Sequence, residues 1–201
     1  MGGALPLSRA MTEKPYHHGD LRNALLVAGE AELTERGIEG FSLRSVAKRA
    51  GVSHAAPAHH FGDVRGLLTA LAAEGFRRFQ ASLDQREADI TDPRERAVTA
   101  ALGYLDFAQA SPALFRLIFS SKRPDMTDPD LTAAAGVAYR HLVWLIAELG
   151  GTDADVAALW AMSHGIADLA AGNRLRIVSG LPEAERDAMI RGLIDRVLPR
   201  A

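Results

Sequence analysis

Apolar residues recur along most of the chain at the three- and four-residue spacing that gives an α-helix one buried face. No segment shows the sustained alternation of apolar and polar residues that is typical of a strand. The longest regular stripe, in a helix that begins near Asp63, consists of Leu68, Leu71, Ala72, Phe76, Phe79 and Leu83. The pattern therefore predicts an all-α chain of about nine helices.

Glycines and capping residues set the expected helix ends. Gly37 and Gly51 each follow a periodic stretch and precede an apolar residue, as in a left-handed C-cap. Ser42 and Ser53 stand where the side chain of an N-cap residue accepts a backbone hydrogen bond. These signals predict helices at about Asp20–Arg36 and Leu43–Ala50, a short helix after Ser53, a long helix from Asp63, and five more at Arg94–Ala110, Pro112–Ser121, Leu131–Leu149, Asp153–Ile177 and Glu183–Leu198.

Residues 42–61, "SLRSVAKRAGVSHAAPAHHF", predict two short helices joined by a three-residue turn that contains Gly51. With the first helix as support, they form a helix-turn-helix unit. Pro57 and Phe61 are four residues apart, so both can pack inward. Such turns occur in many all-α proteins, and the spacing alone leaves DNA binding and plain packing both open.

The outer face of the second of these helices favours DNA binding. Helical spacing places His54 beside Ala58, and Ala55 beside His59, on the side away from Pro57. Small side chains let the backbone approach the floor of a groove. Alanine methyl groups can contact a thymine methyl group, and an imidazole can hydrogen-bond a base edge or a phosphate.

Charge supports this reading locally, although the chain as a whole has a net charge of −2. Residues 41–65 contain four cations, Arg44, Lys48, Arg49 and Arg65, and one acid, Asp63. Phosphate contacts supply about half or more of the hydrogen bonds in protein–DNA interfaces, so a local patch is sufficient. We expect Arg44 to make such a contact, with Lys48 and Arg65 as further candidates.

The run "HHGDLRNALLVAGEAELTERGIEGFSLRSVAKRAGVSHAAPAHHFGDVRGLLTALA" resembles the N-terminal domain of the TetR family of bacterial transcriptional regulators over about 55 residues. The resemblance rests on a long first helix ending in "RG", then "FSLRSVAKRAGVS", a short helix ending in "HHF", and an "LL" helix. It implies a homodimer that places its third helix in the major groove of a palindromic operator. It also implies a larger C-terminal domain that binds a small-molecule effector and thereby weakens DNA binding. We expect a repressor, and the sequence leaves an activator open as the alternative.

The resemblance also implies roles for single residues. Ser42 would cap the second helix, His54, Ala55 and Ala56 would face bases, and His59 and His60 would lie at the DNA backbone. The complete expected DNA-binding set is Ser42, Arg44, Lys48, Ser53, His54, Ala55, Ala56, Ala58, His59, His60 and Arg65.

Two positions depart from the family's pattern. Ala58 stands where the family most often has tyrosine, and Val64 where it often has lysine. Arg65, next to Val64, compensates for the missing lysine only in part. The departures put the affinity and the contact details in doubt more than they do the class of protein.

The last two predicted helices favour a dimer. Ile190, Leu193, Ile194 and Val197 form one stripe, and the helix from residue 153 is apolar nearly all round. A helix that is apolar on several faces needs cover from more than one side. We expect a homodimer in which residues 153–198 of two subunits form a four-helix interface. The alternative is that these helices form the internal core of a monomer.

Aromatic residues of the C-terminal half predict an apolar ligand site, for which core packing is the alternative reading of each residue. The stretch "LWAMSHG" places Trp160 and His164 one turn apart and resembles the W…HG signature of one TetR subgroup. The expected ligand-binding residues are Tyr104, Phe107, Phe115, Phe119, Tyr139, Trp144, Trp160 and His164. The expected effector is apolar or amphipathic.

Other functional classes are less well supported by the sequence. The chain has no cysteine, which excludes disulfides and thiolate chemistry, and no apolar run reaches the roughly 20 residues of a membrane span. The histidines lack metal-ligand spacing. We therefore expect a cytoplasmic bacterial protein with no metal, no cofactor and no catalytic residue, although two alternatives remain: an enzyme using Trp160, His164 and Asp168, and a ligand-binding or scaffolding protein with a vestigial helix-turn-helix.

The expected domain organisation follows from these assignments. We expect a flexible tail over residues 1–15, a helix-turn-helix DNA-binding domain over 16–65, a connecting helix over 66–86, and a ligand-binding and dimerisation domain over 87–201.

Overall fold

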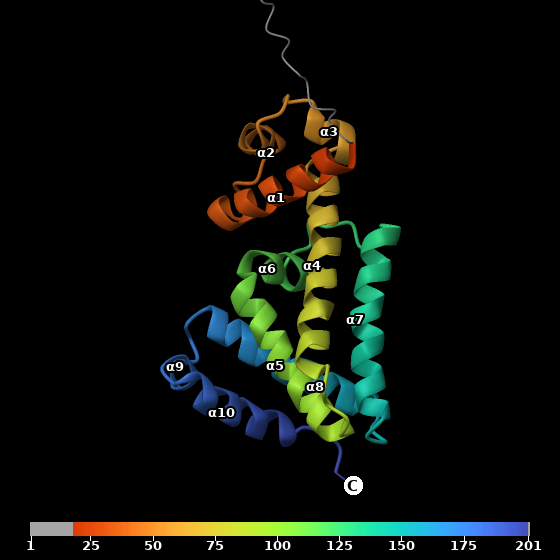
Figure 1. Cartoon of the computed structure of the whole chain (residues 1–201), viewed down its shortest axis with the longest axis vertical. Helices are drawn as coiled ribbons and strands as arrows, with labels where there is room; N and C mark the ends of the chain where they lie inside the picture. Colours follow the sequence, from red (N-terminus) through yellow and green to blue (C-terminus); the bar gives the residue numbers. More distant parts are fainter. Residues whose placement is uncertain (1–17, 201) are drawn as a thin grey trace, which may run out of the picture.

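The computed structural model of the chain describes residues 18–200 and is helical throughout its regular elements (Figure 1). The expectation of an all-α fold is confirmed for this part of the chain, and the expected tail at 1–15 lies outside it. The helices are α1 (His18–Arg36), α2 (Leu43–Ala50), α3 (Ala56–Phe61), α4 (Val64–Glu87), α5 (Pro93–Ala110), α6 (Pro112–Ser120), α7 (Pro129–Ala147), α8 (Asp153–Ala171), α9 (Arg176–Ser179) and α10 (Glu183–Asp195).

The long helix α4 connects the two halves of the molecule. Figure 1 shows α1, α2 and α3 grouped around its N-terminal end and the later helices around its remaining length. The six residues of the stripe predicted on this helix are all buried. Leu67 and Leu71 lie beside Gly29 of α1, whereas Phe76 and Phe79 lie among the aromatic residues of α5 and α6. The apolar face of α4 thus contributes to the core in both halves of the molecule.

Three predicted helix boundaries are wrong, one of them at α10, which ends at Asp195 and not at Leu198. The helix expected over 153–177 ends at Ala171, because Asn173 adopts the left-handed conformation with φ of 51°. The amide of Arg174 then donates to the carbonyl of Leu169 over 2.8 Å, which reverses the chain and separates the single turn α9 from α8. At the third boundary, α3 begins at Ala56 with Ala55 as its N-cap, so Ser53 does not cap it.

The last helix, α10, packs against α5 and α8 of the same subunit. Ile190 and Ile194 from the predicted stripe are completely buried there. Arg94 of α5 holds the end of this helix by donating to the Asp195 carboxylate over 2.7 Å and to the Pro199 carbonyl over 2.7 Å. Within residues 18–200, no helix combines the length and apolar character needed to cross a membrane.

Candidate nucleic-acid interface and ligand pocket

The angle between α2 and α3 is fixed by caps and by buried side chains. Ser42 has an extended backbone, and its hydroxyl accepts a hydrogen bond from the Ser45 amide at 3.2 Å, as predicted for an N-cap. Gly51 ends α2 with φ of 68°, a conformation that favours glycine. Val46 and Ala47 of α2 are completely buried. The N-terminal helices therefore hold α3 rigidly against the rest of the unit.

The exposed side of α3 is the one predicted from its spacing. Pro57 is buried, whereas His54, Ala55, Ala58 and His59 are exposed. Two other residues of the expected DNA-binding set, Ala56 and His60, are half-buried beside this face, and Ser53 is exposed in the preceding turn. The face therefore combines small side chains with imidazoles and is open to a partner.

The four cations of this region have different surroundings. Arg44 and Lys48 are exposed on α2 and form no ion pair with any residue of the described part of the chain. Arg49 instead binds the buried Glu32 carboxylate at 3.1 Å and also pairs with Glu35. Arg44 and Lys48 thus remain available to an anionic partner, while Arg49 ties α2 to α1.

Arg65 at the start of α4 also has an internal partner. Its guanidinium lies 3.2 Å from the carboxylate of Asp125 in the connection between α6 and α7. Both side chains keep considerable exposure, 60% for Arg65 and 38% for Asp125. Arg65 is therefore exposed to solvent, but unlike Arg44 it already has an acidic partner.

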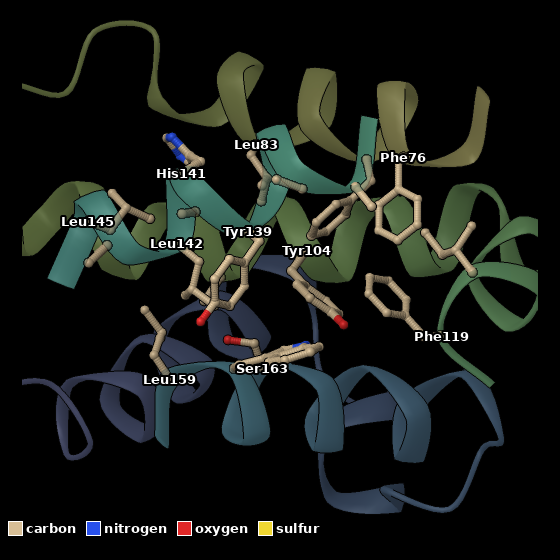
Figure 2. Close-up of a pocket in the computed structure, with 18 of the residues that line it drawn as sticks. Phe76, Leu83, Tyr104, Phe119, Tyr139, His141, Leu142, Leu145, Leu159 and Ser163 are labelled. Atoms are coloured by element: carbon tan, nitrogen blue, oxygen red, sulfur yellow. The ribbon is translucent and has the colours of Figure 1, made fainter. Parts of the chain in front are cut away.

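The C-terminal half contains an apolar cavity of about 380 Å³ between α4, α5, α6, α7 and α8 (Figure 2). Three of its lining residues, Met126, Tyr139 and Trp160, are exposed to solvent. The lining residues are Phe76, Phe79, Leu83, Ala97, Ala100, Ala101, Tyr104, Ile118, Phe119, Met126, Ala135, Ala138, Tyr139, His141, Leu142, Leu145, Leu159, Trp160 and Ser163. A cavity of this size and lining suits a small, largely apolar molecule.

Hydroxyl groups supply much of the polarity of this cavity. Figure 2 shows the hydroxyls of Tyr104, Tyr139 and Ser163 on the side next to α8. The Tyr104 hydroxyl lies 3.0 Å from Nδ1 of His164. Burial raises the pKa of Tyr104 well above its usual value, although a hydrogen bond with Trp160 opposes the shift. The Tyr104 phenol therefore stays protonated and uncharged.

One ionisable pair lies at an end of the cavity. His141 of α7 is one of the lining residues, and Figure 2 shows its ring at the edge of the group, directed away from Tyr104, Tyr139 and Ser163. Its Nε2 atom lies 2.8 Å from the carboxylate of Glu87, whose side chain is only 8% exposed. The pair places a carboxylate behind the cavity wall and a hydrogen-bonding ring on its surface.

The structure divides the predicted ligand-binding residues into two groups. Tyr104, Phe119, Tyr139 and Trp160 line the cavity. The other four lie outside its lining: Phe107 packs on Phe79, Phe115 stacks on His164 at 5.5 Å, and Trp144 is half-exposed beneath the Arg96 guanidinium. The presence of an aromatic ring in the sequence therefore did not distinguish residues that line the cavity from residues that pack outside it.

Sequence reasoning missed other parts of the cavity. Phe76, Phe79 and Leu83 belong to the α4 stripe, which was interpreted as core only. His141 and Ser163 were not predicted at all. A signal for His141 was present, because Ala138, Leu142 and Leu145 share its face at helical spacing.

The residues of the proposed enzymatic alternative are held by other partners. His164 bonds to Tyr104, and Asp168 forms an ion pair with Arg174 at 2.6 Å. No hydrogen bond or ion pair joins His164 to Asp168 in the structure. Across residues 18–200, no three side chains of the His, Asp or Glu type come together as a group that could hold a metal ion.

Two family models match the chain, one in each half. The model described as "Bacterial regulatory proteins, tetR family" matches residues 25–71. The model described as "Tetracyclin repressor-like, C-terminal domain" matches residues 97–197.

Among curated proteins, the HTH-type transcriptional regulator BetI of Yersinia pestis (strain Pestoides F) is 32% identical over 123 residues, covering 60% of this chain and 62% of that protein. BetI of Burkholderia cenocepacia (strain HI2424) is 32% identical over 125 residues, covering 61% and 64%. The match therefore spans less than two thirds of these relatives' length.

Solved structures share the fold. A protein of unknown function from Rhodococcus sp. RHA1 is 34% identical, with a TM-score of 0.78, covering 94% of this chain and all of the other. The multidrug binding protein EbrR complexed with imidazole is 20% identical, with a TM-score of 0.64, covering 98% of this chain and 99% of its own. At that identity, the likeness to EbrR concerns the fold alone.

Proposed function

The chain belongs to the TetR family of bacterial transcriptional regulators, and from this premise we propose that it represses transcription as a homodimer on a palindromic operator and is released by a small apolar or amphipathic molecule. In this proposal it acts in the cytoplasm, and it is not an enzyme. Residues 18–65 read DNA, α4 connects the two functions, and residues 87–200 bind the effector and the second subunit.

The observation that carries the DNA-binding part is the exposed surface of α2 and α3. His54, Ala55, Ala58 and His59 face outward, and the cations Arg44 and Lys48 have no internal partner beside them. Small side chains permit close approach to bases, and free cations neutralise phosphates.

A gel-shift titration with the DNA upstream of the protein's own gene tests this part. Specific binding with a logarithm of affinity that falls linearly with the logarithm of salt concentration supports it, because phosphate contacts release counterions. Absent binding, both to that DNA and to duplexes selected from a random pool, would contradict it.

For the homodimer, we propose that the faces of α7 and α8 form the symmetric contact. Val143, Trp144 and Leu169 are large apolar residues that remain 36% to 41% exposed on these helices. Gly165 offers a second argument. A Cβ atom added there meets no atom within 4 Å, so no close contact within the subunit requires glycine at this position. Glycine inside a helix nevertheless costs about 1 kcal/mol of stability relative to alanine. A second subunit that approaches α8 closely at this position would explain why a glycine stands there.

This face differs in part from the expected one. The prediction placed the interface on the helices of residues 153–198. In the structure α10 packs against α5 and α8, where Ile190 and Ile194 are buried and Leu193 is half-buried. Helix α8 remains in the proposed interface, and α7 replaces α10. Light scattering coupled to size-exclusion chromatography tests the dimer itself, and a monomer at micromolar concentration contradicts it.

For effector release, we propose that the cavity in the C-terminal half is the site of binding. It touches α4 through Phe76, Phe79 and Leu83, and α4 carries the helix-turn-helix at its other end. A ligand that shifts α4 changes the separation of the two recognition helices, which must match half-sites about 34 Å apart. Effector-dependent loss of the gel shift tests the coupling.

A further inference from the structure

The cavity offers a ligand no permanently charged cation. Its lining contains no lysine and no arginine. Arg96, on neighbouring α5, is engaged elsewhere: it donates to the Ile90 carbonyl over 2.8 Å and lies over the Trp144 ring. The polar groups on the wall are hydroxyls, the Trp160 indole and the His141 ring.

An acidic group lies beside the cavity instead. The Glu87 carboxylate lies behind His141 and is buried, with the His141 ring as the hydrogen-bond partner at its Oε1 atom. A ligand carboxylate in the cavity would lose its hydration without gaining a cation, and it would add a second negative charge near Glu87. Burial of a charge without a partner is strongly unfavourable.

We propose that the effector is an uncharged aromatic or alicyclic molecule with a hydroxyl or carbonyl group, and that the cavity selects against carboxylates. The proposal rests on the proposed function of the cavity as the effector site. The rings of Phe76, Phe79, Tyr104 and Phe119 provide apolar surface for the ligand skeleton, and the hydroxyls next to α8 provide its hydrogen bonds.

Calorimetric titration with three biphenyl compounds of nearly equal size tests this selection: 4-phenylbenzyl alcohol, 4-phenylbenzoate and 4-phenylbenzylamine at pH 7.5. We expect the alcohol to bind roughly tenfold or more tightly than the carboxylate, because the carboxylate is buried without a counter-charge. Equal or tighter binding of the carboxylate or of the amine, or no binding by any of the three, overturns the proposal.

A variant identifies the source of the selection. Glu87→Gln removes the carboxylate behind His141 and leaves the cavity wall unchanged, so the preference for alcohol over carboxylate should narrow about threefold or more. Asp84→Asn is the matched control, because Asp84 lies one turn earlier on α4 and bonds to Gln80 outside the cavity. An unchanged preference in Glu87→Gln contradicts the electrostatic cause.

Gel shifts separate this inference from the proposed function. If the alcohol binds as expected but does not release DNA, the regulatory proposal fails while the ligand class stands. If a carboxylate releases DNA best, the regulatory proposal stands while the ligand class fails.

An independent observation concerns the connection between α6 and α7, residues 121–128, which crosses α4 near the helix-turn-helix (Figure 1). The backbone amide of Asp125 in this connection donates a hydrogen bond to the Thr69 hydroxyl of α4 over 2.8 Å. The Asp125 carboxylate lies 3.2 Å from the guanidinium of Arg65. Thr127 donates to the same carboxylate over 2.7 Å and fixes its orientation. Hydrogen bonds from Thr127, with a smaller contribution from Arg65, hold the pKa of Asp125 below its usual value.

The next residue of this connection reaches the effector cavity. Met126 lies on the cavity wall, directly after the residue that binds Arg65. One short segment therefore touches a predicted DNA-contacting cation on one side and the candidate ligand site on the other.

We infer that Asp125 is a positioning residue that competes with DNA phosphate for Arg65 and so lowers operator affinity in the free subunit. The inference rests on the proposed DNA-binding function and on the predicted contact of Arg65. A carboxylate and a phosphate oxygen bind the same guanidinium donors, so one displaces the other.

Gel-shift titrations with Asp125→Asn in two backgrounds test the competition. In the wild-type background we expect about threefold tighter operator binding, the size of an exposed ion pair, and a salt slope steeper by about 0.9. In an Arg65→Ala background the same substitution should have no effect on the slope. Equal effects in both backgrounds, or weaker binding in Asp125→Asn, overturn the inference.

A matched control tests for a general change in charge. Glu39→Gln removes an equal charge from the exposed ion pair with Arg123 of the same connection, but Glu39 does not contact Arg65. We expect this variant to leave the salt slope unchanged. If wild-type protein binds no DNA at all, the proposed function fails; if it binds normally and Asp125→Asn behaves like Glu39→Gln, only the competition fails.

Discussion

Three arginines of the DNA-binding half, Arg44, Arg49 and Arg65, carry the same charge but have different neighbours. Arg44 projects into solvent, Arg49 binds the buried Glu32, and Arg65 faces Asp125. A free cation can neutralise a phosphate, a cation bound to a buried acid stabilises the fold, and a cation bound to an exposed acid can exchange partners. At the scale of the residue, surroundings therefore decide the role.

Arg44→Ala tests the first of these roles. We expect affinity for specific and non-specific DNA to fall together, by about tenfold at low salt, and the salt slope to decrease by about 0.9, because one phosphate contact is lost. Gel-shift titrations at several salt concentrations measure both. Arg116→Ala is the control: Arg116 is an exposed arginine of α6, outside the helix-turn-helix, and its removal should leave the slope unchanged.

Arg49→Ala tests the second role and should affect stability. Loss of the guanidinium leaves the buried Glu32 carboxylate with Arg36 as its remaining ion-pair partner. We expect the thermal midpoint to fall by about 2–4 °C, as for a loss of one interaction in a chain of this size. Differential scanning calorimetry measures the shift, and a midpoint equal to that of Arg44→Ala would contradict the structural role of Arg49.

At the scale of the helix, α4 shows how one apolar stripe serves two purposes. Its N-terminal part closes the core under α1, and its C-terminal part forms a wall of the cavity. Helical spacing predicted burial correctly for all six residues of the stripe. Spacing could not show that some of them border a cavity, since a residue packed against side chains and one facing a cavity have the same periodicity.

Ala135→Leu tests the cavity from α7. Ala135 lines the cavity and is half-buried, so a larger apolar side chain fills space that the effector needs. We expect operator binding to be retained and effector affinity to fall roughly tenfold, with little change in stability because the added methyl groups enter existing space. Ala133→Leu, at an exposed position of the same helix, should leave effector affinity unchanged; calorimetric titration compares the two variants.

At the scale of the whole molecule, the distribution of exposed apolar residues indicates where a second copy binds. Ile190 and Ile194 of α10 are buried inside the subunit, whereas Trp144, Val143 and Leu169 remain exposed on α7 and α8. The dimer interface sets the distance between the two recognition helices. The position of this interface therefore determines how a shift of α4 changes the affinity for DNA.

Two glycines allow a matched test of that location. Gly165 of α8 and Gly192 of α10 both lie within helices, and an added Cβ meets no atom within 4 Å at either position. We expect Gly165→Glu to weaken dimerisation by roughly tenfold or more, since the interface would bury an unpaired charge, and Gly192→Glu to leave it unchanged. Analytical ultracentrifugation measures both. Weakening by both variants would support the interface that the sequence predicted, through the helices of residues 153–198, and weakening by Gly192→Glu alone would place the interface on α10.

The sequence by itself determined the all-α class, most of the helix ends, the caps at Ser42 and Gly51 and the outward face of α3, because each depends on residues within one or two turns of one another. It placed the end of α8 wrongly, because Asn173 and the bond between Arg174 and Leu169 interrupt a pattern that still looks helical.

Only the tertiary structure decided which aromatic residues border the cavity, that His141 faces Glu87, and that Asp125 reaches Arg65. The residues of each ion pair are 54 and 60 positions apart along the chain. Local periodicity carries no information about such distances, since they are set by how whole helices pack around α4.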